Sequence, residues 1–179
     1  MAKKKEIFTI GHSNRSLEEF VELLTTHGIT RLVDVRTIPR SRNNPQFNSE
    51  DLSSTLKKHR ISYLHMKELG GLRHPRKDSV NLGWHNESFR GYADYMQRPE
   101  FSDALDALVQ LAEDRPTAIM CAEAVPWRCH RSLIADALTV RGFEVKDIIS
   151  RTSSKEHSLN PMAVVDHGRV TYPAESIRS

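Results

Sequence analysis

The amino-acid sequence predicts an α/β fold: a mostly parallel, five-stranded, Rossmann-like sheet with helices on both faces, followed by a C-terminal hairpin. Short β-rich runs alternate with amphipathic helical segments between residues 7 and 149, the pattern of parallel strands joined by crossover helices. Capping residues and glycines separate these segments, and a length of 179 residues fits one domain. We expect a single α/β domain over 1–179, with a core of about 6–150 and an appendage at 151–179.

The elements of the first third are predicted by β-rich runs and helix caps. Residues 7–10 are expected to form a strand, and Ser16 followed by Glu19 is a capping box that begins a helix. Gly28 stands where a glycine that ends a helix is expected. The further elements before residue 66 are a strand at 32–35, a helix that begins near Ser49, and a strand at 61–65.

The remaining elements follow a long predicted loop. Residues 67–88 contain Gly70-Gly71, Pro75 and Gly83, and loops of this length tend to be functional or mobile. After it we expect helices at 89–97 and 100–113, a strand at 117–121, a helix at 129–141, a strand at 143–149, and a hairpin of 163–165 and 169–172.

Composition restricts the class of protein. The apolar content of 38% supports a packed core, and no stretch approaches the ~20 apolar residues of a membrane span. The basic N-terminus lacks the apolar region of a signal peptide, so we expect a cytoplasmic protein without a membrane partner. In a reducing compartment its two cysteines indicate a metal site, a reactive thiol or core packing rather than a disulfide framework.

Positive charge is concentrated in the middle of the chain. The segment 36–90 contains eleven Lys/Arg and five Asp/Glu, a surplus of six in a chain whose net charge is +3. The rest of the chain therefore carries a net −3, and the basic segment favours an anionic partner. That partner is a small ligand or a nucleic acid, and a solvated basic loop is the plain alternative.

Polar side chains directly follow four of the predicted parallel strands. In open α/β sheets, ligands bind outside the carboxyl ends of the strands. The sequence therefore predicts a site at this edge of the sheet, and the residues that reach it are His12 and Ser13, Asp34 and Arg36, His65, and Cys121 with Glu123.

Cys121 is the centre of this predicted site. At the end of an apolar strand it is either a small buried hydrophobic residue or a reactive thiol. Arg128, His130 and Arg131 stand near the start of the next helix, where each cation opposes the helix dipole by ~0.3–1 kcal/mol unless an anion binds there. That anion is a Cys121 thiolate, Glu123 or a bound ligand, and such a thiolate is a competent nucleophile.

The neighbouring residues receive roles from their chemistry. Glu123 or His12 is expected to act as the acid or base. Asp34 is expected to pair with Arg36 or Arg131 in a structural role. The residues expected to bind the substrate are Ser13, Arg36, His65, Arg128, His130 and Arg131.

A metal site is the alternative for the same residues. Cys121, Cys129, His130, His12 and His65 are of the types that bind zinc or iron, although Cys129 can instead face the core at the start of its helix. The sequence contains no P-loop, no complete GxGxxG and no HExxH, so it indicates no particular cofactor.

Four segments resemble the "domain of unknown function 488" family. They are Thr9-Ile-Gly-His-Ser13, Asp34-Val-Arg36 with Pro39-x-Ser41, Leu69-Gly-Gly71, and Cys121-Ala-Glu with Pro126 and Cys129-His-Arg131. The resemblance extends over residues 8–149. It implies the same α/β fold and a site around Cys121, and it implies no activity, because the activity of that family is not established.

These observations lead to one leading expectation and two alternatives. The first is a small enzyme that binds a phosphate- or nucleotide-like anion at the strand ends and uses Cys121. The second is a nucleic-acid-binding protein that uses the basic segment 36–90, whose affinity would fall steeply with salt. The third is a metal-dependent enzyme with Cys and His ligands.

Overall fold

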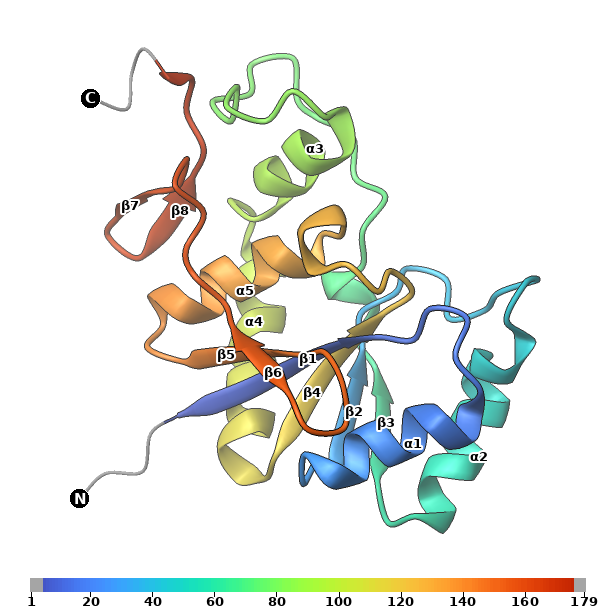
Figure 1. Ribbon diagram of the computed structural model, residues 1–179. Coiled ribbons are helices and arrows are strands. Elements are labelled where there is room, and N and C mark those ends of the chain that lie inside the picture. The colour runs from blue at the N-terminus through green and yellow to red at the C-terminus, as the bar shows by residue number, and fades with distance from the viewer. Residues whose placement is uncertain (1–4, 176–179) are drawn as a thin grey trace.

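The computed structural model describes residues 5–175 and has a six-stranded sheet at its centre (Figure 1). The strand order is β3-β2-β4-β1-β5-β6. The first five strands in the sequence are parallel, and β6 joins β5 in the antiparallel sense. The strands are β1 (Glu6–Gly11), β2 (Arg31–Asp34), β3 (Ser62–His65), β4 (Thr117–Cys121), β5 (Glu144–Ile148) and β6 (Ser154–Glu156).

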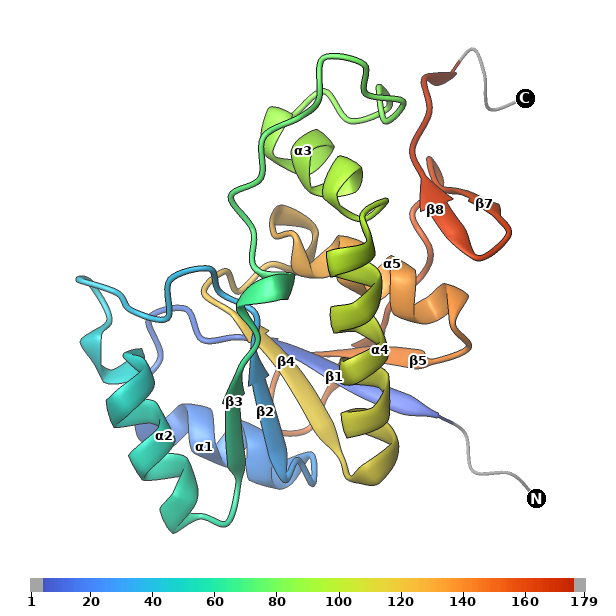
Figure 2. The same ribbon diagram turned by 180° about the vertical axis from the view of Figure 1, so that it is seen from behind.

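Helices cover both faces of the sheet, as predicted. Figures 1 and 2 show α1 and α2 on one face and α4 and α5 on the other, with α3 farther from the sheet, beyond α4 and α5. Each face has its own apolar cluster: Phe20, Leu24 and Leu52 lie in one, and Leu108 and Leu133 lie in the other. The helices are α1 (Leu17–Thr26), α2 (Ser49–Lys58), α3 (Glu87–Tyr95), α4 (Pro99–Asp114) and α5 (Arg131–Val140).

The helix ends follow from local chemistry. The Ser16 hydroxyl accepts a hydrogen bond from the Glu19 amide at 3.1 Å, which confirms the predicted cap of α1. Gly28 follows this helix with a φ of 73°, a left-handed conformation that glycine adopts without a steric penalty. The helix predicted from residue 89 begins earlier, because Asn86 accepts hydrogen bonds from the amides of Ser88 and Phe89 and caps α3.

The order of the strands places a topological switch point at their carboxyl ends. The chain crosses from β1 to β2 and β3 in one direction, and later from β4 to β5 in the other. The loops that leave the adjacent strands β1 and β4 therefore run to opposite faces, which is the arrangement that opens a ligand crevice in α/β sheets. The order also exchanges β1 and β4 relative to the classic dinucleotide-binding order 3-2-1-4-5-6.

One strand and a second helix start also differ from the prediction. The sheet has a sixth strand, β6, in a segment that was expected to be a polar appendage. Its three residues are all exposed, so no alternation of apolar residues marked it. The helix expected from residue 129 begins at Arg131, because Pro126–Arg128 first form the 3-10 turn η3.

The C-terminal hairpin lies against α5 and the long loop. Its strands are β7 (Val164–Asp166) and β8 (Arg169–Thr171), which confirms the predicted hairpin. The buried Tyr172 follows it, and its hydroxyl donates to Asp136 on α5 at 2.7 Å. The Tyr172 amide also donates to Asn81 at 2.8 Å, so this segment joins α5 to the loop.

The long segment between β3 and α3 is held at several points. It begins with the 3-10 turn η2 (Lys67–Leu69). Further on, the buried Asp94 of α3 accepts hydrogen bonds from the Arg76 amide, the Ser79 hydroxyl and the Asn81 amide group at 2.7–2.8 Å. These contacts fix its 76–81 part to α3.

Candidate functional site

The carboxyl ends of β1, β2, β3 and β4 meet at one edge of the sheet. In the strand register, Gly11 lies beside Cys121, and Asp34 lies beside both Met120 and His65. The His12 amide donates to the carbonyl of Cys121 at 2.9 Å, which continues the β1–β4 pairing past the strand ends. The predicted groups therefore do come from adjacent strands.

The loop after Cys121 packs directly on the end of β1. A Cβ atom placed on Gly11 would lie 1.9 Å from the Glu123 carbonyl oxygen and 2.7 Å from the Ala124 Cα. No side chain can occupy that space, so glycine is required by the close approach of two backbones. This contact holds the 122–124 segment in place just after Cys121.

Four residues form what we call the sulfur cluster: Cys121, Cys129, His130 and Arg131. The Sγ atoms of the two cysteines are 2.8 Å apart, with Cys129 as the donor, and both cysteines are buried and free. The η3 turn brings Cys129 back toward the end of β4. The Arg131 guanidinium donates to the Cys121 Sγ through Nη1 at 3.3 Å.

Arg131 is a buried cation without a carboxylate partner. It is 1% exposed. Its other side-chain contact is from Nη2 to the Ala124 carbonyl at 3.4 Å, and its Nε has no hydrogen-bond partner. Within residues 5–175, no Asp or Glu lies within ion-pair distance of it. An uncompensated buried charge costs several kcal/mol, so a negative group belongs beside this guanidinium.

The Cys121 sulfur is suited to carry that negative charge. Burial opposes ionisation, but the hydrogen bond donated by Cys129 and the charge of Arg131 outweigh it and lower the pKa of Cys121. The hydrogen bond to Cys121, together with burial, raises the pKa of Cys129. Of the two cysteines, Cys121 is therefore the one whose ionised form the surroundings favour.

His130 is neutral at neutral pH. Burial is the main cause that lowers its pKa to about 4. Its Nε2 lies 3.0 Å from the Val35 carbonyl and its Nδ1 lies 3.5 Å from the Cys129 Sγ. These contacts assign the proton to Nε2, which donates to Val35, and leave Nδ1 as an acceptor. The sequence led us to expect three cations near the start of α5, and two of them remain, Arg128 and Arg131.

The N-cap residue of α5 is His130, whose side chain makes no capping hydrogen bond, and Cys129 precedes it. The Cys129 carbonyl accepts from the Ser132 amide at 3.0 Å, and its Sγ lies 3.5 Å from the Arg131 amide. The first turn contains no acidic residue. Arg128 is exposed on the preceding turn, whereas Arg131 is buried.

A cavity of about 320 Å³ lies beside the sulfur cluster. This volume is in the range of small-molecule sites. Cys121 lies behind Cys129 and does not line the cavity. Side chains on its wall include Leu72, Phe89, Tyr92, Arg128, Cys129 and His130.

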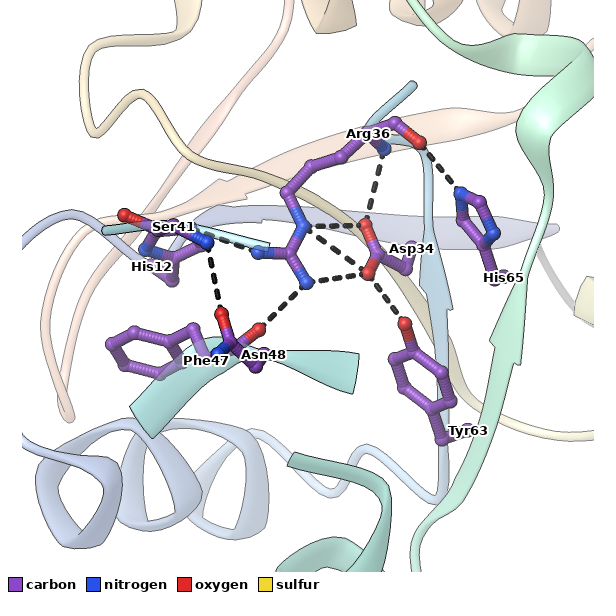
Figure 3. A network of polar contacts seen from close by, with 8 residues as sticks. All are labelled: His12, Asp34, Arg36, Ser41, Phe47, Asn48, Tyr63 and His65. Atoms are coloured by element: carbon purple, nitrogen blue, oxygen red, sulfur yellow. Dashed lines mark hydrogen bonds and ion pairs between the residues drawn. The ribbon is translucent and has the colours of Figure 1, made fainter. Parts of the chain in front are cut away.

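A second set of polar residues lies at the end of β2 (Figure 3). Asp34 and Arg36, both buried, form a two-pronged ion pair, with Arg36 Nη2 2.7 Å and Nε 2.9 Å from the carboxylate oxygens. The Tyr63 hydroxyl donates to Asp34 at 2.5 Å, and Arg36 Nη2 also donates to the Phe47 carbonyl at 2.8 Å. The pair ties the 36–48 loop to the sheet, which confirms the expected pairing of Asp34.

His12 belongs to this second set through its ring. Its Nδ1 lies 2.8 Å from the Ser13 carbonyl, its Nε2 lies 3.4 Å from Arg36 Nη1, and its ring stacks on Phe47 at 4.4 Å. Desolvation lowers the pKa of His12. Both ring nitrogens therefore have partners away from the Cys121 sulfur, and the acid or base role of His12 stays a prediction.

The other predicted site residues lie around these two sets. His65 Nε2 contacts the Arg36 carbonyl at 2.7 Å, and the Ser13 amide donates to the Ala122 carbonyl at 2.9 Å. Glu123 is exposed, and its carboxylate accepts from the Val125 amide in its own loop. Within the described residues the Cys121 sulfur contacts the Glu123 backbone carbonyl, at 3.6 Å, and not its carboxylate, so the role of Glu123 as base also stays a prediction.

Cys129 is the residue that the sequence reasoning did not include in the catalytic or binding set. The sequence feature that could have identified Cys129 is its position: only seven residues separate it from Cys121, between the end of a strand and the start of a helix. A loop that connects a strand end to an adjacent helix start brings its own ends close together. The spacing alone did not reveal that both sulfurs face each other.

Neither the alternative metal site nor the alternative nucleic-acid-binding segment is supported by a specific arrangement of side chains. Within the described part of the chain, no group of three or more His, Cys, Asp or Glu side chains is placed to hold a metal ion. Several cations of the basic segment have partners within the protein: Arg36 with Asp34, Arg40 with Glu50, Arg73 over the Tyr95 ring, and Arg76 with Asp78. Nucleic-acid binding by this segment remains a prediction.

One of three comparisons with known proteins places the chain in a family. Between residues 5 and 175, no helix has both the length and the apolar character needed to cross a membrane. Comparisons with curated proteins and with solved structures gave no match. The family described as a domain of unknown function, DUF488, matches residues 16–138, which is 123 of the 179 residues and includes Asp34 and Cys121. The chain therefore belongs to the DUF488 family.

Proposed function

We propose that this chain is a thiol-dependent enzyme that binds an anionic ligand beside the sulfur cluster and uses the Cys121 thiolate as its nucleophile. The observation that carries the proposal is Arg131, a buried guanidinium that donates a hydrogen bond to the Cys121 sulfur at 3.3 Å and has no carboxylate partner among the described residues. A core cysteine needs no such cation, and placing an arginine there is costly unless it stabilises an anion. The proposed role of Arg131 is therefore to keep Cys121 ionised.

The site also has donors left for a ligand. Arg131 Nε has no partner, and Arg128 is exposed at the wall of the cavity. A phosphate or carboxylate in this cavity would accept charge-assisted hydrogen bonds from Arg128, and Arg131, which does not line the cavity, would attract it through its charge. The apolar and aromatic wall formed by Leu72, Phe89 and Tyr92 would exclude water from the rest of the ligand.

The ionisation of Cys121 tests the proposal directly. The ultraviolet absorbance of the thiolate, followed against pH, should show one thiol titrating well below the unperturbed value of about 8.5. Cys121→Ser should abolish this transition. Arg131→Met should move it to higher pH, while the matched variant Arg128→Met, at an exposed arginine, should leave it in place. Two thiols that both titrate above pH ~8.5 in the wild type would refute a thiolate nucleophile.

Thermal unfolding in inorganic phosphate tests the anion site. At a concentration ten times Kd, phosphate should stabilise the wild type by ~1.4 kcal/mol, or ~3–6 °C in Tm, relative to chloride of equal ionic strength. Arg128→Ala should abolish this shift and Arg131→Ala, which removes a buried charge behind the cavity wall, should reduce it, whereas Arg151→Ala, at a distant exposed ion pair, should retain it. A wild-type Tm that does not respond to phosphate would contradict the assignment of both arginines.

A further inference from the structure

The closest contact between side chains in the sulfur cluster is the one between its two sulfur atoms. Their separation of 2.8 Å exceeds the length of a disulfide bond, about 2.05 Å, by less than ~1 Å. Both sulfurs lie in the same buried apolar cluster, and the chain has no other cysteine. A bond between them therefore requires a small local movement and no rearrangement of the fold.

The two thiols differ in a way that suits sequential reaction. The Cys129 sulfur donates its hydrogen bond to Cys121, and Arg131 contacts the Cys121 sulfur alone through its side chain. Cys121 is therefore the attacking thiolate, and Cys129 is the second thiol held against it. In redox-active proteins this combination is a reactive cysteine next to a resolving cysteine.

Access restricts the oxidant to a small molecule. Cys121 is 2% exposed and lies behind Cys129, which lines the cavity of about 320 Å³. A bulky disulfide would have to displace the cavity wall to reach Cys121. A hydroperoxide such as hydrogen peroxide is close to water in size and needs the smallest displacement.

We propose that Cys121 and Cys129 are a reversible dithiol–disulfide couple that a small hydroperoxide oxidises. In the first step the Cys121 thiolate attacks one peroxide oxygen; the S–O bond forms, the O–O bond breaks, and the hydroxide that leaves takes up a proton to become water. In the second step the Cys129 sulfur attacks the Cys121 sulfenic acid. The S–S bond forms, the S–O bond breaks, and the leaving hydroxide combines with the Cys129 proton. In total, two thiols and one hydrogen peroxide give one disulfide and two waters.

This inference requires no ligand in the cavity, so it stands or falls separately from the proposed enzyme activity. The reduced wild-type protein is treated with one equivalent of hydrogen peroxide, and the products are identified by intact mass and by peptide mapping. The expected product is a monomer that has lost two hydrogen atoms, with Cys121 and Cys129 in one linked peptide pair. Dithiothreitol should restore both thiols.

The single variants separate the two steps. Cys129→Ser should stop the reaction at the Cys121 sulfenic acid, which dimedone traps, whereas Cys121→Ser should react no faster than a free thiol. A cysteine of ordinary pKa is about 3% ionised at pH 7, so full ionisation of Cys121 corresponds to a reaction about 30-fold faster. Arg131→Met should lose most of that advantage.

Three outcomes would refute the proposal that Cys121 and Cys129 form a dithiol–disulfide couple. In the first, the wild type accumulates oxidised Cys121 while Cys129 remains a free thiol. In the second, the disulfide joins two molecules rather than two cysteines of one chain. In the third, neither thiol of the folded wild type reacts with peroxide faster than a free small thiol. All three outcomes are measured on the wild-type protein, so none of them requires a substituted protein to fold correctly.

Discussion

His130 connects Cys129 of the sulfur cluster to Val35, the residue after β2. Its burial makes the stability of the fold depend on pH. Its pKa is lowered to about 4 in the folded chain, chiefly by desolvation, against about 6.5 when unfolded. Between these values the unfolded chain binds a proton that the folded chain does not. Stability is therefore present above pH 6.5 and is lost as the pH falls toward 4, by on the order of 3 kcal/mol.

Urea unfolding at several pH values between 7.5 and 4.5 measures this loss. His130→Gln should flatten the curve, because glutamine retains a donor for the Val35 carbonyl and does not titrate. The matched variant His167→Gln, whose side chain is 93% exposed, should retain the wild-type slope. His12 also has a lowered pKa, so part of the slope should survive in the His130 variant. Equal slopes in the wild type and His130→Gln would show that His130 does not carry the effect.

At the residue scale, the sequence predicted positions better than pairings. Cys121 and Arg131 were expected at the site from the end of an apolar strand and the start of a helix, and the contact between them follows that expectation. The cysteine pair was not predicted, because it depends on how the 122–128 loop folds back. The neutral state of His130 was not predicted either, since burial by Tyr92 and the cavity wall comes from α3, far along the chain.

At the scale of elements, the ends of β1 and β4 determine where Cys121 is held. Replacing Gly11 with alanine places a methyl group 1.9 Å from the Glu123 carbonyl oxygen. Because the obstacle is backbone, the 122–124 segment must move. We expect a loss of ~3 kcal/mol or more, as for overpacked sites, together with a higher pKa of Cys121.

Gly28→Ala is the matched control for this substitution. A Cβ at Gly28 meets nothing within 4 Å, and its φ of 73° limits the cost to about 1 kcal/mol. It should leave the Cys121 titration unchanged. Chemical unfolding and thiol titration of both variants decide the matter: if Gly11→Ala changes stability and thiol ionisation no more than Gly28→Ala does, the close approach does not position the cysteine.

Strands and helices with strong periodicity were predicted closely, and the departures share a cause. The strand at 117–121 has the predicted bounds because all five residues are apolar or buried. In contrast, β6 is formed by the exposed residues Ser154, Lys155 and Glu156, which join the sheet by pairing with β5. The start of α5 depends on a 3-10 turn that ends with Cys129 as a cap. Interactions made by the backbone or by a sulfur leave no periodic pattern in the sequence.

At the scale of the whole molecule, Asp136 joins the last part of the chain to the α/β core. This α5 carboxylate is 2% exposed and accepts hydrogen bonds from His157 Nε2 at 2.7 Å, the Asn160 amide at 3.1 Å and the Tyr172 hydroxyl at 2.7 Å. The backbone of Tyr172, in turn, forms hydrogen bonds with the long loop: its amide donates to the Asn81 side chain, and its carbonyl accepts from the Gly83 amide. One side chain therefore holds two segments that are far apart in the sequence.

Asp136→Asn should loosen the C-terminal segment without disturbing the sulfur cluster. One carboxylate oxygen becomes an NH2 group that cannot accept a bond, so a buried donor is left unsatisfied, and we expect a loss of ~2–4 kcal/mol. Limited proteolysis should then cut between residues 150 and 175 faster than in the wild type. The control Asp166→Asn removes an exposed carboxylate and should change stability by less than ~0.5 kcal/mol.

The Cys121 titration separates a local effect from a general one in this variant. Arg131 occupies the first turn of α5, and Asp136 lies further along the same helix. If the C-terminal segment is attached to a core that is already complete, the titration in Asp136→Asn should match the wild type while proteolysis increases. A shifted titration together with the same proteolysis pattern as the wild type would mean that Asp136 supports α5 itself, and that the last part of the chain is held by other contacts.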